Sequence, residues 1–66
     1  MTVELISVGT EILMGSIVNT NAAFLSAGCA SIGLSIYNQQ VVGDNPDRLS
    51  DAINLALGRA DTVIIT

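Results

Sequence analysis

Hydrophobic and polar positions follow two different periods along the chain, and the changes of period predict its secondary structure. Three short apolar runs rich in β-branched residues, at 3–8, 34–42 and 61–66, favour strands. Between them, apolar residues recur every three or four positions, as on one face of a helix. They are Ala22, Leu25, Cys29 and Ile32, and then Leu49, Ala52, Ile53, Ala56 and Leu57. The pattern predicts the order β-α-β-α-β.

This order predicts an α/β fold with a mainly parallel sheet. A strand, helix and parallel strand in one sheet are connected right-handedly, so the helices lie outside the sheet. The third strand carries Val63, Ile64 and Ile65 in succession, as expected of a parallel strand that is covered on both faces. We expect Tyr37 of the second strand to pack on the sheet.

Helix ends are marked most clearly in the second helix. Asn45 is suited to cap it, Pro46 fits its first position and Gly58 follows its last apolar residue.

In the first helix, Asn19 or Thr20 is expected to cap the start, and Gly33 the end. Gly28 inside this helix costs about 1 kcal/mol relative to alanine. It therefore predicts either tertiary packing that holds the helix or a close approach of another backbone.

The connector from Gly9 to Asn19 is the strongest candidate for a functional segment. Strand-to-helix connections usually take ~2 to 6 residues. This one is longer and lies at the carboxyl end of a strand, where open α/β sheets bind ligands. It matches neither the G-x-G-x-x-G fingerprint nor a phosphate-binding G-K-[ST] loop.

Each polar residue of the connector has both a structural and a functional interpretation. Gly9 and Gly15 could serve unusual backbone angles or let amides approach a phosphate. Glu11 could be a solvated carboxylate or cap of a short helical turn, or a metal ligand or general base. Asp44, after the second strand, could belong to a turn or face the same crevice.

Three further polar residues, at the first helix start, could cap it, form the rim of a ligand site, or do both. They are Asn19, Thr20 and Asn21.

Composition excludes several classes of partner. The net charge is −4, with two arginines and neither lysine nor histidine, which argues against nucleic-acid binding and against a membrane surface. One cysteine permits no internal disulfide, and the lack of histidine excludes a Cys/His zinc site. We expect a cytoplasmic protein.

Length limits the core that this chain can build. A chain of 66 residues buries only ~60% of its unfolded surface. Half of the residues are nonetheless hydrophobic. We therefore expect residues 1–66 to be the amino-terminal part of a single larger domain.

Three segments of the chain carry a recognisable pattern: Glu4–Gly15, Ile17–Asn21 with Phe24–Leu25, and Val41–Asn45. Together they resemble the amino terminus of the CinA (competence/damage-inducible protein A) family, whose first domain is similar to the molybdopterin-binding MoaB/Mog domain. The resemblance implies a three-layer α/β/α sandwich. It also implies metal-dependent hydrolysis of the pyrophosphate of ADP-ribose, often in a protein with a nicotinamide-nucleotide amidase domain.

Carried over to this sequence, the resemblance implies a pocket with two candidate catalytic carboxylates, Glu11 and Asp44. The implied ligand-binding residues are Gly9, Thr10, Gly15, Asn19, Thr20 and Asn21. The implied partners are a divalent metal ion, a nucleotide or pterin phosphate, and further copies of the full-length protein in a homo-oligomer. The alternative is a non-catalytic molybdopterin- or nucleotide-binding module.

The sequence departs from the family pattern in two respects. In the family the third strand runs into a G-G-[LV]-G-P-T-x-D-D segment that supplies a second phosphate loop, and this chain ends before it. Its only cationic side chains are Arg48 and Arg59, which we expect on the outside of the second helix. The chain by itself is therefore expected to be inactive.

Overall fold

The chain folds into three strands and three helices. The computed structural model describes residues 1–66. Its elements are β1 (Thr2–Val8), α1 (Thr10–Leu13), α2 (Thr20–Ser31), β2 (Ser35–Val42), α3 (Pro46–Leu57) and β3 (Thr62–Ile65). The predicted strands and the two long helices are confirmed, while the predicted connector also contains the short helix α1.

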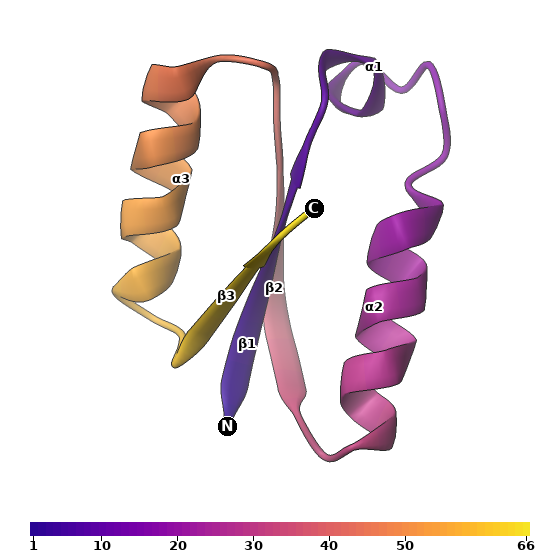
Figure 1. Cartoon of the computed structure of the whole chain (residues 1–66), viewed down its shortest axis with the longest axis vertical. Helices are drawn as coiled ribbons and strands as arrows, with labels where there is room; N and C mark the ends of the chain where they lie inside the picture. The colour runs from indigo at the N-terminus through magenta and orange to yellow at the C-terminus, as the bar shows by residue number, and fades with distance from the viewer.

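The three strands form one parallel sheet in the order β2-β1-β3, with β1 in the middle (Figure 1). The register shifts between Val3 and Glu4, where Tyr37 of β2 has no opposite residue. The side chain of Tyr37 is 77% exposed, so the expectation that it packs on the sheet is wrong. Its position in the bulge takes it out of the regular alternation of the strand.

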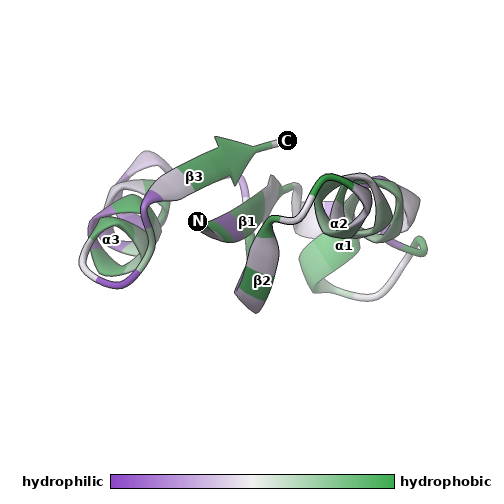
Figure 2. Ribbon diagram, turned by 90° about the horizontal axis from the view of Figure 1, so that it is seen from below, coloured by the Kyte–Doolittle hydropathy of each residue, from purple (hydrophilic) through white to green (hydrophobic).

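The two long helices cover opposite faces of the sheet, so the chain has three layers (Figure 2). On the α3 face, Ile6 and Val42 pack with Ala52 and Ala56. On the α2 face, a second cluster contains Val3, Leu5 and Cys29. The predicted α/β class follows from this arrangement. Neither long helix, nor any other helix, is long and apolar enough to cross a membrane.

The predicted helix caps are confirmed. The side chain of Asn45 accepts hydrogen bonds from the backbone N–H groups of Asp47 and Arg48, and Pro46 opens α3. The side chain of Asn19 caps α2. Gly33 follows α2 with a φ of 83°, a conformation that glycine adopts without strain.

The tertiary packing expected to hold the first long helix is present, because Leu25 and Cys29 pack with Leu5 of β1. No atom outside the helix lies within 4 Å of the position that a Cβ of Gly28 would take, so the alternative of a close backbone does not apply. The expected place of Ile32 on the apolar face is wrong. It is 74% exposed, because the helix ends one residue before it and it no longer follows the buried stripe.

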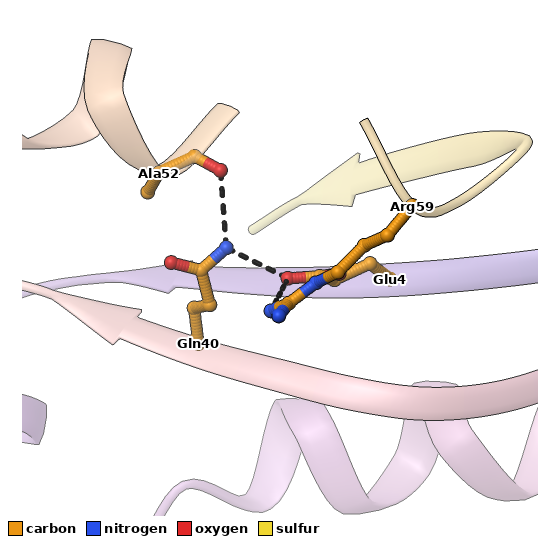
Figure 3. Close-up of polar contacts among 4 residues, drawn as sticks. All are labelled: Glu4, Gln40, Ala52 and Arg59. Carbon is orange, nitrogen blue, oxygen red and sulfur yellow. Dashed lines mark hydrogen bonds and ion pairs between the residues drawn. The ribbon is translucent and has the colours of Figure 1, made fainter. Parts of the chain in front are cut away.

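Glu4 is a buried carboxylate on the α3 face of β1 (Figure 3). Arg59 donates to both of its oxygens, from Nε and from Nη2, each at 2.8 Å. Gln40 of β2 donates from Nε2 to Glu4 at 2.7 Å and to the carbonyl oxygen of Ala52 at 3.0 Å. The hydrogen bond from Arg59 lowers the pKa of Glu4, against the opposing effect of burial.

The Glu4–Arg59 ion pair shows that the expected position of Arg59, on the outside of the second helix, is wrong. The residue follows α3 instead of lying on it, and its guanidinium group turns to the sheet. An unpaired buried carboxylate would lower the stability of the fold, so the ion pair with Arg59 stabilises Glu4 in the sheet. Arg59 is therefore occupied by Glu4, which leaves Arg48 as the cationic side chain without an ion-pair partner.

Candidate functional site

The carboxyl ends of all three parallel strands lie side by side at one edge of the sheet. The N–H of Gly9, directly after β1, donates to the carbonyl oxygen of Val42 at the end of β2, at 2.9 Å. The N–H of Val8 donates to the carbonyl oxygen of Thr66 after β3, also at 2.9 Å. Because the loops after β1 and β2 leave from this edge, they are held next to each other.

Thr10 and Asp44, two of the predicted site residues, are brought together at this edge. The backbone N–H of Asp44 donates to the hydroxyl oxygen of Thr10 at 3.2 Å, across 34 residues of sequence. This bond fastens the loop after β2 to the first residue of α1. Both residues are exposed. The carboxylate of Asp44 takes part in no hydrogen bond and no ion pair, so it is free to bind a ligand.

Glu11 folds back over Gly9. A Cβ on Gly9 would stand 2.9 Å from Oε1 of Glu11 and 3.2 Å from Cδ1 of Ile12. The φ of Gly9 is 161°, which is extended backbone. An unusual backbone angle therefore does not require the glycine, and an added Cβ would displace the movable ends of the Glu11 and Ile12 side chains. The glycine lets the Glu11 carboxylate lie against the end of β1.

Gly15 has a different role from Gly9. Its φ is 77°, and no atom lies within 4 Å of the position of an added Cβ. The conformational interpretation of this glycine is therefore correct, and the residue is exposed at the end of the turn that follows α1.

Asn19 uses both ends of its side-chain amide within the protein. Its Oδ1 accepts from the N–H of Ala22 at 3.2 Å, and its Nδ2 donates to the hydroxyl oxygen of Ser7 at 2.8 Å. Ser7 is 2% exposed. The two bonds attach the start of α2 to the carboxyl-terminal half of β1.

The other two predicted rim residues are less constrained. Thr20 and Asn21 are exposed, and their side chains form no hydrogen bond within the protein. No hydrogen bond joins Gly15, Thr20 or Asn21 to Thr10, Glu11 or Asp44. Hydrogen bonds thus join the ends of β1 and β2. Of the three polar residues at the start of α2, only Asn19 is hydrogen-bonded to β1.

The donor atoms at this edge suit a hard cation that also binds a phosphate. Glu11 and Asp44 carry carboxylates and Thr10 a hydroxyl, and oxygen is the ligand atom that Mg²⁺ prefers. Mg²⁺ is commonly held by only one or two carboxylates together with the phosphates of a substrate. No group of three acidic, histidine or cysteine residues is assembled anywhere in the chain. A metal held by these residues would therefore depend on the substrate for its other ligands.

Sequence reasoning missed two residues of this region. Ser7 gives no signal beyond being a small polar residue in an apolar strand, yet its hydroxyl positions Asn19. A Cβ on Gly43 would stand 3.3 Å from Cδ2 of Leu13 and 3.7 Å from Oγ1 of Thr10. Gly43 therefore allows α1 to lie close to the end of β2.

A comparison with protein families identifies the family of this chain. The family model described as "Probable molybdopterin binding domain" matches residues 4–66. The chain belongs to this family. This is the family that the resemblance of Glu4–Gly15, Ile17–Asn21 and Val41–Asn45 implies, so the predicted MoaB/Mog-like resemblance is confirmed.

Similar proteins connect this family member to CinA. A protein of Clostridium novyi (strain NT) with the name "Putative competence-damage inducible protein" is 54% identical over 66 residues, which are 100% of this chain and 16% of that protein. One from Bacillus thuringiensis (strain Al Hakam) is 58% identical over the same share of both chains. The chain thus spans about a sixth of the length of these relatives, and the predicted CinA resemblance is confirmed.

A solved structure confirms the fold. The crystal structure of the protein CinA with unknown function from Thermoplasma acidophilum superposes with a TM-score of 0.94 at 38% identity. The match covers 97% of this chain and 38% of that one. The parallel β-α-β-α-β arrangement of this family member is therefore that of a CinA protein.

Proposed function

We propose that this chain forms one wall of a metal-dependent pyrophosphatase site that hydrolyses ADP-ribose in a cytoplasmic CinA-type protein. The observation that carries the proposal is the hydrogen bond from the N–H of Asp44 to Thr10 Oγ1. It fastens the loop after β2 to the segment that carries Glu11. Two carboxylate-bearing segments from different strands are thereby held at the edge of the sheet where ligands of α/β folds bind.

The roles follow from the chemistry of a pyrophosphate. Glu11 and Asp44 would hold a divalent cation, which supplies neutralising charge for the phosphate oxygens. Thr10 is positioned to donate a hydrogen bond to a phosphate oxygen, since its Oγ1 accepts from Asp44 and its proton is free. The oxygen of a water attacks one phosphorus, and the bond from that phosphorus to the bridging oxygen breaks. The products are AMP and ribose 5-phosphate.

The test uses a chimera, because the chain spans only 16% of its relative from Clostridium novyi. This chain replaces the matched 66 residues of that relative, and AMP release from ADP-ribose is measured with and without Mg²⁺. We expect metal-dependent release. Glu11→Gln and Asp44→Asn should each lower kcat by about 10²-fold or more, the range of a positioned catalytic group. Asp47→Asn, a carboxylate on α3, is the matched control and should leave kcat unchanged.

Gly9→Ala tests the position of Glu11. The added Cβ would stand 2.9 Å from Oε1 of Glu11, so the carboxylate must move while the backbone keeps its extended conformation. We expect turnover of ADP-ribose to fall in this variant of the chimera and thermal stability to change little. Equal turnover in Gly9→Ala, Glu11→Gln and the unmodified chimera would remove Glu11 from the site.

The second candidate is a non-catalytic module that binds molybdopterin or a nucleotide. The lack of a third acidic, histidine or cysteine residue beside Glu11 and Asp44 favours it, because binding a phosphate needs fewer carboxylates than hydrolysing one. Calorimetry would measure binding of ADP-ribose or a pterin phosphate to the chimera without metal. Binding without release of AMP would support this candidate and overturn the proposal of a pyrophosphatase.

A further inference from the structure

The first turn of α2 is held to the sheet mainly by polar groups, whereas the rest of the helix is held by apolar ones. α2 runs antiparallel to β1, so its start lies towards the carboxyl end of the strand (Figure 1). Cys29 and Leu25, farther along the helix, pack with Leu5 in the middle of β1. The first turn adds only the small side chain of Ala22 to the buried residues of the helix. The position of this turn therefore depends on the hydrogen bonds of Asn19.

The orientation of the Asn19 amide follows from the chemistry of its two neighbours. The N–H of Ala22 can only donate, so the atom that faces it at 3.2 Å is the oxygen Oδ1. The nitrogen Nδ2 then faces the hydroxyl oxygen of Ser7 at 2.8 Å, and that oxygen accepts. Turning the amide over would place one N–H group against another. Both ends of the amide are thus held by buried residues of this chain.

The bond from Asn19 to Ser7 is the one hydrogen bond between the start of α2 and β1. The preceding segment, 14–18, donates backbone hydrogen bonds only to α1, the last of them from the N–H of Ser16 at 2.8 Å. Ser7 lies in β1, just before the strand passes into α1. The bond therefore fixes the neighbours of Asn19, which are Thr20 and Asn21, relative to the segment that carries the candidate carboxylate.

We propose that Asn19 is a positioning residue of the candidate site and does not itself bind the substrate. Through its bond to Ser7, it sets Thr20 and Asn21 against the end of β1, and these two residues make the contacts with the substrate. The inference rests on the proposed function, because there must be a site for the residue to position. It adds Ser7, a buried residue of the strand, to the groups on which the affinity for substrate depends.

Asn19→Asp separates a positioning role from a ligand role. A carboxylate keeps the cap by accepting from the N–H of Ala22, and its other oxygen can accept from the Ser7 hydroxyl, which then donates. It has no proton to give to a substrate, whereas the amide keeps one Nδ2 proton beyond the one bonded to Ser7. The KM for ADP-ribose is measured in the chimera at raised salt, which screens a charge that does not touch the substrate. We expect Asn19→Asp to keep the KM of the unmodified chimera and Asn19→Ala to raise it.

Ser7→Ala removes the anchor and leaves the Asn19 amide and its cap in place. We expect the KM for ADP-ribose to rise about tenfold, as when the residue behind a ligand-binding group is changed. KM does not depend on the fraction of molecules that are folded, so a rise reports the pocket, whereas a loss of stability alone lowers the apparent kcat. Because the bond can be lost only once, the double variant of Ser7→Ala and Asn19→Ala should have the KM of Asn19→Ala.

Ser26→Ala is the matched control. Ser26 lies on α2 about two turns beyond Asn19, and its Oγ accepts from Nε2 of Gln39 in β2 at 2.8 Å. The variant therefore removes another serine hydrogen bond between this helix and the sheet, away from the candidate site. It should leave both KM and kcat unchanged. All variants are compared at a temperature below the thermal midpoint of the least stable one, measured by circular dichroism.

Two outcomes overturn this inference while the proposed function stands. One is turnover by the chimera with a KM that Ser7→Ala leaves unchanged. The other is a KM that rises as far in Asn19→Asp as in Asn19→Ala, because Asn19 would then donate to the substrate. A chimera that binds ADP-ribose without hydrolysing it is judged by the same comparisons, with the Kd from calorimetry in place of KM. An unmodified chimera that neither hydrolyses nor binds ADP-ribose overturns the proposed function, and this inference with it.

Discussion

Replacing Asn19 by alanine tests whether this residue holds the fold or serves a ligand. The side chain caps α2 by accepting from the N–H of Ala22, and loss of such a cap costs about 1 kcal/mol. It also donates to Ser7 Oγ at 2.8 Å, and Ser7 is 2% exposed. Leaving that buried hydroxyl without its donor costs about another 1–2 kcal/mol. We therefore expect Asn19→Ala to lower the free energy of unfolding by about 2–3 kcal/mol.

A loss of this size is readily measured in a chain of 66 residues. At about 0.05–0.15 kcal/mol per residue, its whole stability is on the order of 3–10 kcal/mol. The assay is urea unfolding followed by circular dichroism at one fixed protein concentration, because association of copies would also stabilise the chain. Ser7→Ala should cost about 1 kcal/mol, and the double variant should cost less than the sum of the two single variants.

Asn21→Ala is the control, because Asn21 is exposed at the same helix start and its side chain forms no hydrogen bond. Its effect should stay within about 0.5 kcal/mol. If Asn19→Ala changed stability as little as Asn21→Ala, or if Ser7 and Asn19 acted additively, the reasoning would be refuted. Asn19 would then be free to act as a ligand residue.

Two further predictions concern stability. Gly28→Ala should raise the free energy of unfolding by about 1 kcal/mol, because the residue is exposed within α2 and nothing lies within 4 Å of the added Cβ; a lower thermal midpoint would contradict this. The hydrogen bond from Arg59 holds the pKa of Glu4 below its usual 4.5, so its contribution is present above that pH and is lost as pH falls through the lowered value. An acid titration of stability should therefore show a steeper loss in the unmodified chain than in Glu4→Gln, and parallel curves would exclude this role.

The elements of the fold could be predicted because their signals are local. The cap at Asn45, the proline at Pro46 and the change of period along the chain each involve neighbouring residues. The exposure of single side chains is harder to predict, since periodicity does not say where a helix ends or where a strand bulges. For this reason the pattern predicts packed positions for Ile32 and Tyr37, although both side chains are exposed.

The candidate site was predictable only in part. Thr10 and Asp44 meet because the carboxyl ends of parallel strands share one edge, which is a general rule of such sheets. The bond between Ser7 and Asn19 follows no pattern in the sequence, so the choice between a cap and a ligand rim could not be made. The partner of Glu4 lies 55 residues away, and nothing near either residue indicates the pair.

The position of β1 in the middle of the sheet determines the order in which the chain can be completed during synthesis. β1 is made first, but its hydrogen-bonding partners are β2 at residues 35–42 and β3 at residues 62–65. The carboxylate of Glu4 likewise has no ion-pair partner until Arg59 is synthesised, and the N–H of Thr2 has no acceptor until Asp61 is synthesised. Of the three strands, β1 is therefore synthesised before its neighbours and has both edges covered only once β3 is made, and contacts of such long range favour slow folding.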